Sequence, residues 1–153
     1  MNNKSKLGLL LTSLILGSAA FAETKVEVTL IDKLDEPRGF QTRARPEEGL
    51  QTHSCYSYQG QLAVDQAFDG DLIPEGTFRL IDFKLCMTLT GTSAGSTLAL
   101  DPCDGSELQQ FEHRANGRIV AVAAPGNCIT VGEGPSRHGG GSEPVPLIRD
   151  LQL

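Results

Sequence analysis

A short motif occurs twice in the chain, 42 residues apart. The stretch CMTL at 86–89 recurs as CITV at 128–131, and each copy opens a segment in which apolar and polar residues alternate. Such alternation is typical of a strand with one buried face. A repeat of about 40 residues restricts the fold to architectures built from copies of one small unit, because a single copy cannot bury a core alone.

Two further elements recur at matching distances. A leucine lies five residues before a cysteine at 50–55 and again at 98–103. A Gln-x-Phe triplet follows at 66–68 and at 109–111, and its phenylalanine lies 18 and 17 residues, respectively, before the cysteine that opens the next copy. Agreement of three independent elements indicates a true internal repeat.

The strands expected from this pattern are short, and Pro and Gly separate them. They fall at 26–32, 40–44, 50–55 and 61–68 in the first copy, at 78–82, 86–90, 98–103 and 108–113 in the second, and at 118–123, 128–132 and 147–153 in the third. Little room remains for a helix. The pattern predicts an all-β domain of three pseudo-repeats, a β-trefoil, in which the last strand of the third repeat is missing.

Residues 1–22 have the features of a secretory signal peptide. Lys4 and Lys6 precede the apolar stretch 7–21, and Ala-Phe-Ala at 20–22 supplies the small residues that signal peptidase needs. A transmembrane anchor is the alternative, but the stretch is short for a bilayer and contains several polar or small residues. We therefore expect a secreted or periplasmic chain, residues 23–153, that folds as one domain without membrane insertion.

The net charge of the mature chain restricts the classes of partner that it can bind. Without residues 1–22, 11 basic residues face 19 acidic ones, a formal net charge of −8. A surface of this sign repels nucleic-acid phosphates and anionic lipid, so we expect no nucleic acid as a partner.

The four cysteines favour disulfides over a metal site, because an exported chain meets an oxidising compartment. The chain has no Cys-x-x-Cys pair, and its three histidines lack metal-ligand spacing. We expect neither a metal nor another cofactor. Four cysteines allow three complete pairings, and their spacing alone does not choose among them.

Two stretches match hydrolase motifs. Residues 91–95 read GTSAG, the pattern of a nucleophile elbow, and residues 138–141 read HGGG, as in some oxyanion holes. An elbow joins a strand to a helix, whereas 91–95 falls between two predicted strands. HGGG also lies downstream of this stretch, and 131 mature residues are too few for such a hydrolase. We expect Ser93 to be a loop residue and the protein not to be an enzyme.

The repeats resemble those of the ricin B-type lectin-like β-trefoils, whose copies pair an early cysteine with a later one and then carry Gln-x-Trp. The resemblance covers roughly residues 40–153 and is clearest over 78–131. It implies that Phe68 and Phe111 take the place of the core tryptophan, while the glutamine of each triplet orders a turn.

The same resemblance implies a disulfide between Cys86 and Cys103. Cys55 and Cys128 lack their family partners, because Gln41 stands near the place of one and the chain ends before the place of the other, near 156. Whether these two cysteines are free thiols or join each other stays open.

The resemblance also implies sugar binding, with one shallow pocket in each repeat. The acid that the family places two residues after the first cysteine is here Thr88 or Thr130, so those pockets are expected to be degenerate. In the first repeat, Tyr56 or Tyr58 is expected to stack on a sugar ring while Asp65 and Gln66 bind its hydroxyls. The alternative is that the tyrosines cover the barrel and Asp65 caps a turn.

Two classes of function follow. The first is a secreted, lectin-like module whose partners are glycans. The second is a protein-interaction or toxin-associated trefoil domain that does not bind glycans. The incomplete third repeat leaves strand edges unpaired, and self-association through this open repeat is a further expectation.

Overall fold

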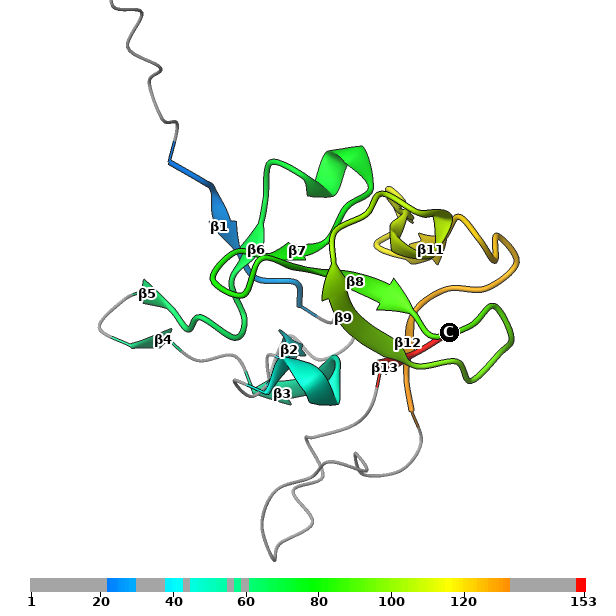
Figure 1. Cartoon of the computed structure of the whole chain (residues 1–153), viewed down its shortest axis with the longest axis horizontal. Helices are drawn as coiled ribbons and strands as arrows, with labels where there is room; N and C mark the ends of the chain where they lie inside the picture. The colour runs from blue at the N-terminus through cyan, green and yellow to red at the C-terminus, as the bar shows by residue number, and fades with distance from the viewer. Residues whose placement is uncertain (1–21, 30–37, 43–44, 55–56, 59–60, 133–150) are drawn as a thin grey trace, which may run out of the picture.

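Short strands and 3-10 turns make up the regular structure of the chain (Figure 1). The computed structural model describes residues 22–29, 38–42, 45–54, 57–58, 61–132 and 151–153. The strands are β1 (Lys25–Val26), β2 (Arg38–Gln41), β3 (Gln51–Ser54), β4 (Ser57–Tyr58), β5 (Gln61–Leu62), β6 (Phe68–Asp69), β7 (Arg79–Leu80), β8 (Leu85–Leu89), β9 (Leu98–Pro102), β10 (Phe111–His113), β11 (Ile119–Ala121), β12 (Thr130–Val131) and β13 (Leu151–Gln152). The 3-10 turns are η2 (Pro46–Glu48), η3 (Ile73–Glu75) and η4 (Glu107–Gln109). The predicted all-β class is confirmed.

The strands pair mainly with neighbours in the chain. The largest sheet has the order β1-β6-β7-β8-β9, and every pair in it is antiparallel. The remaining strands form the pairs β2-β3, β4-β5, β10-β11 and β12-β13. The hairpin of β8 and β9 crosses the centre of the molecule in Figure 1.

One backbone hydrogen bond recurs in each of the three predicted repeats. It runs from Phe40 N to Val28 O (2.9 Å), from Met87 N to Phe78 O (2.8 Å) and from Ile129 N to Ile119 O (2.8 Å). The next strand agrees with this correspondence, because Phe40 pairs with Thr52 as Met87 pairs with Leu100. The repeat seen in the sequence is therefore also present in the backbone.

This register corrects one detail of the sequence alignment. Since Phe40 corresponds to Met87, the residue at the place of Cys86 is Gly39 and not Gln41. Gly39 lies 16 residues before Cys55, close to the 17 residues that separate Cys86 from Cys103, whereas Gln41 lies only 14 residues before Cys55. Neither residue is a cysteine, so Cys55 still lacks a partner within its own repeat.

Glycines allow close backbone contacts between repeats. Gly49 and Gly76 follow η2 and η3 with φ of 78° and 89°, values that L side chains rarely adopt. A Cβ atom would lie 2.4 Å from Leu98 O at the first position and 2.8 Å from Phe111 O at the second. The glycines thus let Leu50 N bond to Leu98 O, and Phe111 N to Gly76 O.

Three phenylalanine rings form the centre of the core. Phe68, Phe78 and Phe111 are 0, 1 and 2% exposed. The ring of Phe78 contacts the other two edge-to-face, with centroid distances of 6.5 Å to Phe68 and 5.9 Å to Phe111. The predicted burial of Phe68 and Phe111 is confirmed. Leu153 also belongs to this core.

Some strand boundaries differ from those predicted. The stretch 61–68 contains two short strands, β5 and β6, because a turn closed by Gln66 N and Ala63 O (3.0 Å) separates them. The stretch 108–113 begins inside η4, and the paired strand β10 begins only at Phe111. Apolar alternation does not reveal these turns, since a backbone hydrogen bond closes the first and the buried Gln109 side chain orders the second.

The predicted signal peptide lies almost entirely outside the described residues, so it stays a prediction. Among the residues that the structure describes, no helix has the length and apolar character needed to cross a membrane.

Candidate functional site

The predicted sugar site of the first repeat lies around the β4-β5 hairpin. Tyr58 belongs to β4 and pairs with Gln61 of β5. The hairpin lies at the edge of the molecule, on the left in Figure 1. Tyr56 lies outside the described residues. Of the two predicted stacking residues, Tyr58 is thus placed on a peripheral hairpin.

Asp65 and Gln66 lie in the turn between β5 and β6. Their exposed fractions are 4% and 0%. The backbone here is tied to the segment that follows β2, because Thr42 N donates to Asp65 O at 3.2 Å. A sugar in solution does not reach these two side chains as they are placed. Their burial favours the alternative that they stabilise a turn.

In the middle repeat, the buried side chain of Gln109 organises the turn after β9. Its Oε1 accepts hydrogen bonds from Asp104 N (2.8 Å) and Gly105 N (3.4 Å), and its Nε2 donates to Thr88 Oγ1 (3.0 Å) and Pro102 O (2.9 Å). The disulfide Cys86–Cys103 closes the same region, with a Cα–Cα distance of 5.1 Å. The disulfide therefore joins the start of β8 to the residue after β9, and the Gln109 amide joins both strands to the turn that follows β9.

Thr88 stands where the resembled family places its sugar-binding acid. Its hydroxyl donates to Cys86 O at 3.0 Å and accepts from Gln109 Nε2. The Thr88 hydroxyl thus uses both its donor and its acceptor capacity within the protein. Nearby, the exposed Asp104 accepts from Ser106 N (2.8 Å), and this backbone hydrogen bond lowers the pKa of its carboxyl.

Replacing Gln109 with alanine is expected to lower the free energy of unfolding by about 2 kcal/mol, because four hydrogen bonds are lost and their partners must be resatisfied by water. Denaturant unfolding measures the loss. Gln110→Ala is the matched control, since the Gln110 amide donates only one long bond, 3.4 Å, to Thr77 Oγ1. Equal stability of the two variants would contradict the role assigned to Gln109.

The hydrolase motifs do not form a site in the described residues. The loop 91–95 connects β8 to β9, two paired antiparallel strands, so the predicted strand-to-strand loop is confirmed. Ser93 is exposed there, and its carbonyl accepts from Ser96 N at 3.0 Å. The HGGG stretch lies outside the described residues.

The described part of the chain contains no group of three or more His, Cys, Asp or Glu side chains arranged to hold a metal ion. Cys128 is a half-buried free thiol, and Cys55 lies outside the described residues. Of the two alternatives for Cys128, a free thiol or a bond to Cys55, the structure shows the free thiol.

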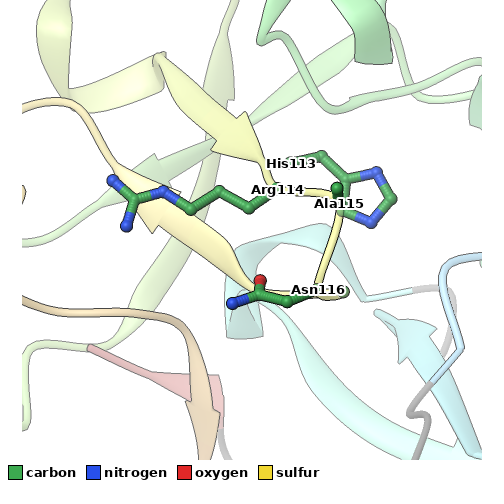
Figure 2. Close-up of a pocket in the computed structure, with 5 residues that line it drawn as sticks. His113, Arg114, Ala115 and Asn116 are labelled. Atoms are coloured by element: carbon green, nitrogen blue, oxygen red, sulfur yellow. The ribbon is translucent and has the colours of Figure 1, made fainter.

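An open pocket that the sequence did not predict lies at the tip of the β10-β11 hairpin. Residues His113 to Gly117 line it, and its volume is about 470 Å³. In Figure 2 the side chains of Arg114 and Asn116 extend to the same side of the turn, whereas the His113 ring lies on the other. The sequence signal was present, because basic residues flank an Asn-Gly turn in HRANGR at 113–118.

A scan against protein-family models found no match to this chain. A search of curated proteins likewise found no similar sequence.

Proposed function

We propose that the chain is a β-trefoil of the ricin B type. The recurrent hydrogen bond in three repeats supports this proposal. The strand order supports it as well. Strands β1, β6 and β7 are consecutive neighbours in one sheet. Phe111 of β10 bonds to Gly76 just before β7, and β10 pairs with β11. In a trefoil these five strands would be successive neighbouring strands of the central barrel.

The function that we propose for this fold is carbohydrate binding outside the cytoplasm, with glycans as partners and without catalysis. The observation that carries the proposal is the middle-repeat turn, in which Gln109, Thr88 and a disulfide hold the positions that resemble the family's sugar-pocket scaffold. Because the polar groups of that turn are used internally, the proposed pocket is in the first repeat. There Tyr56 or Tyr58 would stack on the apolar face of a sugar.

Titration calorimetry with oligosaccharides chosen from a glycan array tests this function. Tyr58→Ala is expected to weaken binding about tenfold, which corresponds to about 1.4 kcal/mol. Ser93→Ala changes an exposed loop residue elsewhere and is expected to leave affinity unchanged. Thermal unfolding of both variants shows whether weaker binding comes from the loss of a contact with the sugar or from the loss of the folded structure. If wild type and Tyr58→Ala bound the oligosaccharide with equal affinity, Tyr58 would have no role in stacking on the sugar.

A protein-interaction domain is the second candidate. The internal use of Gln109 and Thr88 favours it, as does the burial of Asp65 and Gln66, since a module that had lost sugar binding would keep these groups only for structure. A blank glycan array for a folded protein, together with saturable binding to a purified protein partner, would decide for this candidate.

A further inference from the structure

A tight turn sets two arginines opposite each other at the end of the β10-β11 hairpin. Arg114 N donates to Arg118 O and Gly117 N donates to Arg114 O, both at 2.8 Å. Gly117 adopts the left-handed φ of 81° that this turn requires. The ladder pairs Glu112 with Val120 and His113 with Ile119, so its next pair is Arg114 with Arg118. Directly opposed residues lie on the same face of a hairpin, so the two arginines are cross-strand neighbours.

The charges of this pair are only partly compensated. Arg114 forms an ion pair with Glu112, Nη2 to Oε2 at 3.1 Å. Arg118 is exposed and forms no ion pair with any residue whose placement is described. Like charges in directly opposed positions repel each other. One net positive charge therefore remains at this end of a chain whose formal net charge is −6.

Hydrogen-bond donors accompany this charge. Asn116 Oδ1 accepts from Arg118 N at 3.2 Å, which orients the amide and leaves its Nδ2 group as a donor. Figure 2 shows the amide on the same side of the turn as the Arg114 side chain, beside the open pocket. Guanidinium and amide N–H groups together match the oxygens of a carboxylate or a sulfate, which accept several charge-assisted hydrogen bonds.

We propose that the end of the β10-β11 hairpin binds the anionic group, carboxylate or sulfate, of an acidic glycan. The inference depends on the proposed carbohydrate-binding function and names its ligand class. Arg118 supplies the uncompensated charge, Arg114 and Asn116 supply further donors, and Glu112 weakens the site by neutralising Arg114. Because acidic residues outnumber basic ones in the chain, 19 to 13, an anionic ligand is drawn to this end of the hairpin in preference to other places.

The test compares three trisaccharides by titration calorimetry: trigalacturonate, a sulfated galactose trisaccharide and neutral maltotriose. The wild type is expected to bind at least one acidic trisaccharide about tenfold more tightly than the neutral one. The acidic trisaccharide that binds identifies the anionic group. The preference is expected to shrink when NaCl rises from about 50 mM to about 500 mM, because salt screens exposed charges.

Variants locate the site. Arg118→Gln is expected to abolish the preference for the acidic ligand, and Glu112→Gln is expected to strengthen it several-fold, an effect that a purely structural role does not produce. Arg45→Gln is the matched control, because Arg45 is an exposed arginine paired with Glu48 at 3.0 Å in another part of the chain. It is expected to leave the preference unchanged, and thermal unfolding verifies that each variant is folded.

The outcomes separate this inference from the proposed function. Equal binding of the acidic and neutral trisaccharides overturns the inference and leaves carbohydrate binding intact. An acidic preference that survives Arg118→Gln also overturns it. If none of the three ligands binds and the glycan array is blank, the carbohydrate-binding function fails, and the inference fails with it.

Discussion

Phe78→Ala is expected to lower the free energy of unfolding by about 3–5 kcal/mol. The side chain is 1% exposed and lies between Phe68 and Phe111, so its removal loses two edge-to-face ring contacts and leaves a cavity. Small domains are stable by about 5–15 kcal/mol, so this loss is a large part of the total. Denaturant unfolding followed by circular dichroism measures it.

Two controls accompany this experiment. Val122→Ala removes an apolar side chain that is 49% exposed, and a change within about 0.5 kcal/mol is expected there. Phe78→Leu keeps most of the buried volume and is expected to lose less than Phe78→Ala. A Phe78→Ala protein as stable as the Val122→Ala protein would show that the three rings do not form the centre of the core.

Sequence reasoning succeeded where a residue's role depends on its apolar pattern. The all-β class and the loop at 91–95 were predicted from apolar alternation and turn residues, and the burial of Phe68 and Phe111 was implied by the family resemblance. The disulfide Cys86–Cys103 was predicted from family resemblance and is present. The predictions for individual residues all fall in or next to the middle repeat, where the motifs are clearest.

Sequence reasoning was weaker for polar side chains, because a polar residue type does not say which way the side chain points. Asp65 and Gln66 were expected to bind a ligand, yet they are buried in a turn. Arg114 and Arg118 were overlooked, because only the register of the β10-β11 hairpin places them opposite each other. The two-residue shift between Gln41 and Gly39 likewise needed the strand pairing.

The second large effect concerns the disulfide Cys86–Cys103. Removing it in the double variant Cys86→Ala/Cys103→Ser is expected to lower the free energy of unfolding by about 3 kcal/mol, the chain-entropy value for a loop of this size. The two cysteines are 17 residues apart and join the start of β8 to the residue after β9. Five residue pairs already hold these strands together in the folded protein, from Leu85–Pro102 to Leu89–Leu98. We therefore expect the native hairpin to persist, with the loss arising mainly from the freer unfolded chain.

Denaturant unfolding with and without dithiothreitol measures this contribution. The reductant is expected to destabilise the wild type to the level of the double variant and to leave the double variant itself unchanged. Cys128→Ser is the matched control, because Cys128 is a free thiol; this variant is expected to keep the full response to reductant. If the wild type kept its stability in dithiothreitol after loss of the disulfide was verified by mass spectrometry, the cross-link would contribute little. The hydrogen bonds of Gln109 and the β8-β9 ladder would then account for the order of this turn.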